Sequence, residues 1–85
     1  DLVDIAVVYA RQEEGLRFSI RCRPGQIHAG LLVSKALQPY GNGGGHPSMA
    51  GGLIPNGIVE LLGENMHATI HAVFLDAIAE LKEDA

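Results

Sequence analysis

The sequence has no tryptophan, only 5% aromatic residues and a single cysteine, Cys22, among its 85 residues. A lone cysteine excludes an internal disulfide and a cysteine-based zinc cluster, and it fits a reducing, cytoplasmic location. With so few aromatic side chains, the core must be built mainly from the Leu, Ile, Val and Ala residues that raise the apolar fraction to 47%. A chain of this length forms one small domain, which buries only about 60% of the surface that its unfolded form exposes.

Long hydrophobic runs are lacking as well. The longest apolar stretch, around residues 5–10, is far shorter than the roughly 20 residues of a membrane-spanning helix. No basic segment, apolar core and cleavage site open the chain in the manner of a signal peptide, so no membrane contact is expected. Because the chain starts with Asp1 rather than Met, we expect it to be a fragment of a longer protein whose remainder lies upstream.

Basic residues are scarce, and the formal net charge is −4. This balance argues against a protein that coats nucleic acid non-specifically, because basic surface supplies most of that affinity. Residues 11–50 nevertheless hold five basic side chains and two carboxylates, a net charge of +3, whereas the rest of the chain holds one lysine and eight carboxylates, a net charge of −7. A local positive site on an acidic body suits one small anion better than a long polyanion.

Residue periodicity predicts two strands at the start of the chain. Residues 2–10 are nearly all apolar and rich in β-branched side chains, which is typical of a strand covered on both faces, and residues 12–15 indicate a hairpin turn. Apolar and polar residues then alternate strictly over residues 16–23. One face of this strand carries Leu16, Phe18, Ile20 and Cys22, and the other carries Arg17, Ser19, Arg21 and Arg23.

Helical spacing of apolar residues predicts a helix over about residues 27–37, stopped by Pro39, and another over about residues 61–81. Between them, four glycines within residues 41–47 indicate a loop, residues 50–54 a short strand, and Pro55-Asn56-Gly57 a turn. The sequence therefore predicts an α/β fold, a single small domain over residues 1–85 with a mixed β-sheet and flanking helices.

The run Gly43-Gly44-Gly45-His46-Pro47 carries the most chemical information. Consecutive glycines let backbone amides turn toward an anion and let the anion approach without meeting a Cβ atom, which makes a phosphate-binding nest. His46 adds an imidazole that can hydrogen-bond a phosphate oxygen or a ribose hydroxyl. By itself, a glycine run is equally typical of a flexible linker.

The arginine-lined strand supplies the second half of the predicted site. Arg21 and Arg23, with Ser19, lie at alternate positions and therefore side by side on one face. Guanidinium groups bind phosphate bidentately and stack on bases. Such a face alone is typical of a solvated strand, but together with the glycine run it indicates a site for a nucleotide phosphate.

Ser19-Ile20-Arg21-Cys22-Arg23, then a helix, then the glycine run followed by Ala50-Gly51 resemble the C-terminal DHH-associated domain of DHH-family phosphoesterases. This family of hydrolases includes RecJ-like exonucleases, oligoribonucleases and cyclic-dinucleotide phosphodiesterases. The resemblance covers about residues 4–80. It implies substrate-binding roles for Ser19, Arg21, Arg23, Gly43, Gly44, Gly45 and His46. The sequence departs from the family pattern at Met49, where alanine is usual, and at Asn42, where glycine is frequent.

The resemblance also implies an upstream DHH catalytic domain in the same chain. The Asp-His-His segment and the metal-binding aspartates of that domain are absent here, so we expect no catalytic residue and no metal in this fragment, which should be inactive alone. Mn²⁺ or Mg²⁺ is expected in the upstream domain, with a nucleotide or short nucleic acid as substrate. Association into a homo-oligomer is left open.

Two other functions also stay open. Pro47-Ser48-Met49-Ala50 resembles the loop of the C-terminal domain of alanyl-tRNA synthetase, a tRNA-binding module, although that family more often has a basic residue where His46 stands. A non-catalytic nucleotide-binding domain is the second alternative.

His67 and His71 have the spacing of a helical metal pair, but no third ligand is evident, and we expect surface histidines.

Overall fold

The alternation along β2 (Gly15–Cys22) sets the two sides of the fold. Its apolar residues are at most 5% exposed, whereas the arginines and the serine between them face solvent. Because successive side chains of a strand point to opposite faces, the sheet has one face in the core and one open face. The predicted division of this strand is confirmed.

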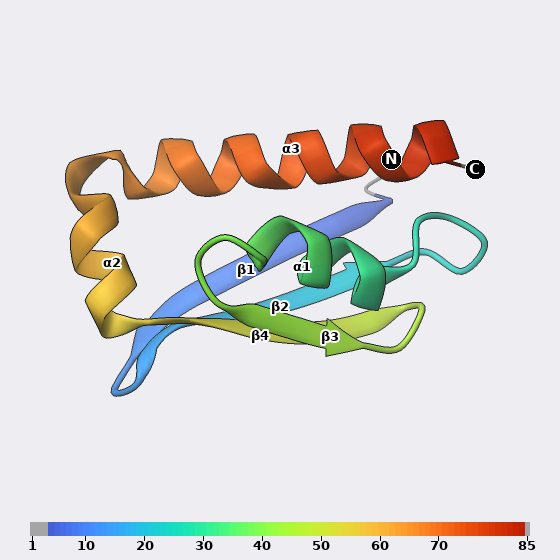
Figure 1. Ribbon diagram of the computed structural model, residues 1–85. Helices are drawn as coiled ribbons and strands as arrows, with labels where there is room; N and C mark the ends of the chain where they lie inside the picture. The colour runs from blue at the N-terminus through green and yellow to red at the C-terminus, as the bar shows by residue number, and fades with distance from the viewer. Residues whose placement is uncertain (1–3, 85) are drawn as a thin grey trace.

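The computed structural model describes residues 4–84. β1 (Ile5–Gln12) forms a hairpin with β2, and β4 (Met49–Pro55) and β3 (Asn42–Gly45) complete a four-stranded sheet in the order β1-β2-β4-β3 (Figure 1). Every pairing is antiparallel. The predicted α/β class with flanking helices is therefore confirmed, but the expectation of a mixed sheet is wrong. The crossover after β2 returns the chain parallel to it in β3, and the short turn after β3 then brings β4 back between the two strands, antiparallel to both.

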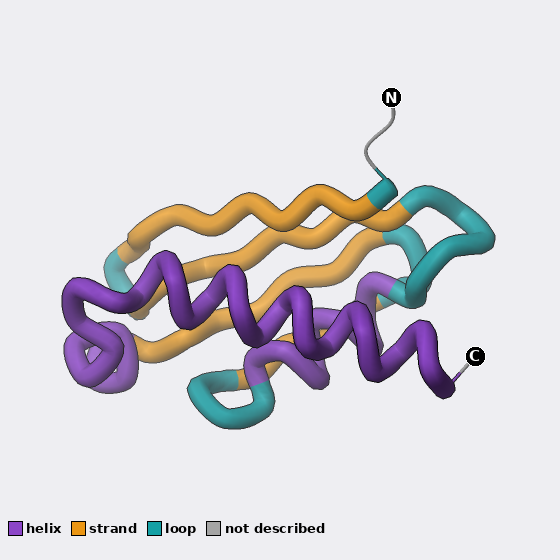
Figure 2. Tube along the Cα trace, turned by 90° about the horizontal axis from the view of Figure 1, so that it is seen from above, coloured by secondary structure: helices purple, strands orange, loops and turns teal. Residues whose placement is uncertain are grey.

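The helices α1 (Ala29–Leu37) and α3 (Met66–Asp84) lie on the same side of the sheet, as Figures 1 and 2 show. Their predicted apolar faces are confirmed, since both helices contribute to one continuous core with β2 and β4. The fully buried side chains of that core include Ile20, Leu32, Val33, Leu37 and Ile54. At the surface, the Lys35 ammonium of α1 lies 3.2 Å from a carboxylate oxygen of Glu80 in α3.

The prediction that the first strand is covered on both faces is wrong. β1 is an edge strand with one uncovered face, where Val8 remains 64% exposed, rather than a strand buried on both faces. The apolar residues of β1 are divided between the core side and the open face of the sheet. Composition alone therefore could not distinguish this edge strand from a strand buried on both faces.

The predicted turn at Pro55-Asn56-Gly57 is the start of a helix, α2 (Asn56–Leu62), for which Pro55 is the N-cap residue. Gly63, with a φ angle of +57°, ends α2, and the 3₁₀ turn η1 (Gly63–Asn65) leads into α3. The single predicted C-terminal helix is thus divided at a glycine in a left-handed conformation. No helix among the described residues is long and apolar enough to cross a membrane.

Candidate functional site

The open face of the sheet gathers side chains from all four strands. In the strand register, directly opposed residues share a face, so three rows run across the sheet. Each row is given in the strand order β1, β2, β4, β3. The first row has no β3 residue and consists of Ala6, Arg21 and Met49. The second consists of Val8, Ser19, Gly51 and Gly44, and the third of Ala10, Arg17, Leu53 and Asn42. Residues that are far apart in the sequence, such as Arg21 and Met49, therefore become neighbours only through strand pairing.

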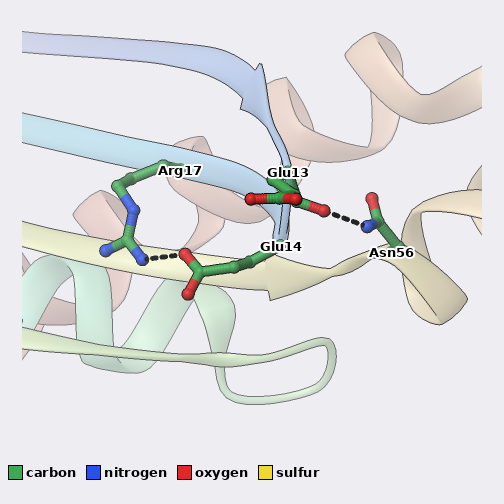
Figure 3. Close-up of polar contacts among 4 residues, drawn as sticks. All are labelled: Glu13, Glu14, Arg17 and Asn56. Carbon is green, nitrogen blue, oxygen red and sulfur yellow. Dashed lines mark hydrogen bonds and ion pairs between the residues drawn. The ribbon is translucent and has the colours of Figure 1, made fainter.

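The three arginines of β2 and its end differ in their surroundings. A guanidinium nitrogen of Arg17 lies 3.0 Å from a carboxylate oxygen of Glu14, and Figure 3 shows this side chain folded across β4 toward that carboxylate. Arg23, just beyond β2, lies 3.4 Å from the carboxylate of Asp4. Arg21 has no ion pair with any side chain of residues 4–83. Of the three guanidiniums, that of Arg21 is therefore the one most available to an external anion.

The glycine run forms the edge strand β3 and not the predicted loop or nest. Gly45 has a φ angle of +152°, and a Cβ atom there would lie 2.7 Å from the Ala50 Cα. A Cβ atom at Gly43 would lie 2.9 Å from a methyl group of Val33 in the core. Glycine at these two positions is required by the fold. Because successive amides of a strand point in opposite directions, they do not converge on one anion as nest amides would.

The turn that carries His46 lies at the Arg21 end of β2. The Cys22 amide donates to the Ser48 carbonyl at 3.0 Å. The first turn of α1 holds the same turn from the other side, because the Gly30 amide donates to the His46 carbonyl at 3.1 Å. His46 itself is exposed. The turn and the arginine strand therefore come together at one corner of the sheet.

The predicted site residues consequently divide into two groups. Ser19, Arg21 and Gly44 share the open face, and the exposed His46 lies in the turn beside the end of β2. Gly43 and Gly45 occupy the alternate, core-facing positions of β3, and Arg23 is engaged with Asp4 on the β1 side.

The open face also holds a trough that the sequence does not predict. Its volume is about 470 Å³, and its lining residues are Arg17, Asn42, Gly43, Gly44, Gly51, Gly52 and Leu53. The only signal in the sequence was the second glycine pair, Gly51-Gly52, whose opposition to the glycine run depends on the register of β3 with β4.

Cys22, His28 and His67, which lie outside the open face, are each held by contacts within the fold. Burial raises the pKa of the Cys22 thiol, as expected for a cysteine in the core. His28 is the N-cap of α1, and its Nδ1 accepts a hydrogen bond from the Leu31 amide at 3.1 Å. His67 Nδ1 lies 2.6 Å from the Tyr9 hydroxyl. Within the part of the chain that the structure describes, no group of three or more His, Cys, Asp or Glu side chains could hold a metal ion.

Comparison with known proteins identifies the family. The family model described as the DHHA1 domain matches residues 2–80, which include β1 through most of α3. No curated protein and no solved structure matches the chain. Because the family model covers nearly the whole sequence, this chain belongs to the DHHA1 domain family, whose members are associated with DHH-family phosphoesterases.

Proposed function

We propose that this chain is the substrate-binding domain of a metal-dependent DHH-family phosphoesterase and that the open face of its sheet binds the phosphate of a nucleotide or short nucleic acid. The observation that carries this proposal is the environment of Arg21. Its guanidinium lies on the uncovered face, without an ion pair among the described residues, at the corner that holds the His46 turn. A phosphate could bind it bidentately without displacing an internal carboxylate.

The neighbouring groups suit the same ligand. The exposed His46 imidazole can donate to a phosphate or ribose oxygen, and the Ser19 hydroxyl on the next row of the open face can donate or accept. Arg23 can join them when its ion pair with Asp4 opens, because exposed ion pairs are worth only about 0 to 1 kcal/mol. Gly43 and Gly45 contribute by shaping β3 and not by contacting the substrate.

In this proposal the residues of this chain bind and orient the substrate, and the hydrolytic reaction takes place in the upstream domain. The expected upstream DHH domain would hold Mn²⁺ or Mg²⁺, and the metal would supply an activated water for phosphodiester hydrolysis. The sheet face holds the part of the substrate that does not react, which lowers the barrier by fixing orientation. The isolated chain is then a cytoplasmic binding module without hydrolytic activity.

The decisive experiment uses the protein that joins this chain to its upstream region. We expect that region to contain an Asp-His-His motif and the joined protein to hydrolyse a dinucleotide in the presence of Mn²⁺. Arg21→Ala and His46→Ala should each lower kcat/KM at least tenfold, or about 1.4 kcal/mol. Arg11→Ala is the matched control, because Arg11 lies opposite Leu16 and so belongs to the helix-covered side of the sheet.

Unchanged kinetics in both variants would remove the open face from substrate binding. An aminoacylation or editing region upstream, in place of the Asp-His-His motif, would favour the tRNA-binding alternative. A gene that begins close to Asp1 would favour a non-catalytic nucleotide-binding domain.

A further inference from the structure

The trough beside Arg17 differs from the phosphate corner beside Arg21, and we propose that it is a nucleobase subsite. In this arrangement one ligand lies along the open face, with its phosphate at Arg21 and its base between Arg17, Asn42 and Leu53. The inference rests on the proposed function, because it assigns the second end of the same nucleotide.

The charge at Arg17 favours a neutral ring over a second anion. Its guanidinium lies 3.0 Å from the Glu14 carboxylate, so an entering phosphate would meet a negative group and would have to displace it. A nucleobase has no such conflict and can stack on the flat face of a guanidinium. Because both side chains are largely exposed, their pairing contributes little to stability. Its consequence is positional, since it holds the Arg17 guanidinium across β4 (Figure 3).

The walls of the trough offer the other contacts that a base requires. The Asn42 amide provides one donor group and one acceptor for the edge of a base. Leu53, opposite Arg17 in the register, provides apolar contact for the ring. This combination of an amide, an apolar side chain and a neutralised guanidinium is suited to a flat heterocycle.

In the floor between these walls, Gly44 is a glycine that the fold itself does not require. Gly44 has an ordinary φ angle, and a Cβ atom there would meet nothing within 4 Å. Its partner Gly51 is constrained only by the Phe18 carbonyl, which lies 3.2 Å from the position of a Cβ atom. Glycine weakens a strand interior and often marks a place where a ligand approaches the backbone closely. The cavity above supplies the space for such a ligand, and a side chain at position 44 would occupy it.

The distance between the phosphate corner at Arg21 and the trough at Arg17 suits a single nucleotide. Arg17 and Arg21 lie on the same face of β2, four residues apart, which corresponds to about 13 Å along a strand. Both side chains are long enough to reach toward the middle row between them. A ligand that carries a phosphate and a base should therefore bind better than one that carries the phosphate and sugar alone.

The test compares AMP with ribose 5-phosphate, which lacks the base, by NMR titration of the isotope-labelled chain. We expect AMP to bind at least tenfold more tightly and to shift the amides of Gly44 and Gly51, whereas ribose 5-phosphate should act mainly near Arg21. Gly44→Leu should abolish the tenfold preference of the chain for AMP over ribose 5-phosphate. Gly57→Leu is the matched control, because Gly57 also has nothing within 4 Å of a Cβ position and lies in α2, outside the trough.

Each remaining outcome decides the matter. Equal affinities of the wild-type chain for both ligands, or a preference for AMP that survives Gly44→Leu, would overturn the base subsite and leave the phosphate site intact. No response to either ligand at millimolar concentration would overturn both proposals. If circular dichroism shows that Gly44→Leu does not fold, Arg17→Ala and Asn42→Ala replace it, and full retention of the AMP preference in both would refute the subsite.

Discussion

Gly30→Ala should destabilise the protein, although the same change usually stabilises a helix. Gly30 is the second residue of α1, and a Cβ atom at that position would lie 2.4 Å from the Gly45 carbonyl oxygen and 2.8 Å from its carbonyl carbon. These are backbone atoms of β3 and cannot rotate away. The helix or the strand must therefore move, even though the Gly30 amide also ties α1 to the His46 turn.

The magnitude follows from two opposing terms. Replacing glycine by alanine where the backbone permits it stabilises a protein by about 0.4 to 1 kcal/mol through the unfolded chain. Overpacking a well-packed contact costs about 1 to 3 kcal/mol. Gly57→Ala gives the first term alone, because Gly57 is the second residue of α2 and a Cβ atom there has open space. Gly30→Ala carries both terms, so the two variants should differ by about 1 to 3 kcal/mol.

Urea denaturation followed by circular dichroism measures this difference directly. We expect a lower midpoint than wild type for Gly30→Ala and an equal or higher midpoint for Gly57→Ala. Since the affected contact also positions the His46 turn, Gly30→Ala should in addition weaken the binding of ribose 5-phosphate. A Gly30→Ala variant as stable as Gly57→Ala would show that α1 does not press against β3 in this way, and the reasoning would fail.

Three further predictions concern contacts away from the proposed site. Asn56→Ala should lower the free energy of unfolding by about 0.5 to 1.5 kcal/mol in urea denaturation, because Asn56 Nδ2 donates to the Glu13 carbonyl at 2.7 Å and ties the β1–β2 turn to the start of α2 (Figure 3). Tyr9→Phe should remove the contact with His67 and lower thermal stability by an amount at the lower end of the same range, because the pair is exposed. Burial raises the pKa of the Cys22 thiol, so the folded chain holds that proton more tightly than the unfolded chain does. Stability should therefore be complete below the ordinary thiol pKa of about 8.5 and decline as the pH rises above it, and denaturation at several pH values should show this decline in wild type but not in Cys22→Ala.

Helices and strands could be predicted where apolar residues recur at a regular spacing along the chain. The alternation over residues 16–23 and the helical spacing within residues 27–37 and 61–81 all give the observed buried faces. Glycine and proline are typical of loops and turns, but here they stand in the strand β3 and at the start of α2. Gly43 and Gly45 form an edge strand because they let β3 lie close to Val33 and Ala50, and that proximity exists only in the folded sheet.

The candidate site was only half predictable. Residue types indicated that Arg21 and His46 belong to an anion site, and the structure brings their segments to one corner. The trough was not foreseen, because it depends on which residues of β3 face those of β4 and on the ion pair that Arg17 makes with Glu14. Neither feature has a local signature in the sequence.

The sequence by itself determined the class of fold, the faces of β2 and of the two main helices, the nature of the core and the family. These properties follow from short-range periods and from motifs that can be recognised along the chain. Only the tertiary structure decided the strand order, the opposition of Gly44 to Gly51 and the difference between Arg17 and Arg21. Strand register is set by long-range pairing and by burial of one whole face, and a shift of one residue would exchange every core side chain with one on the open face.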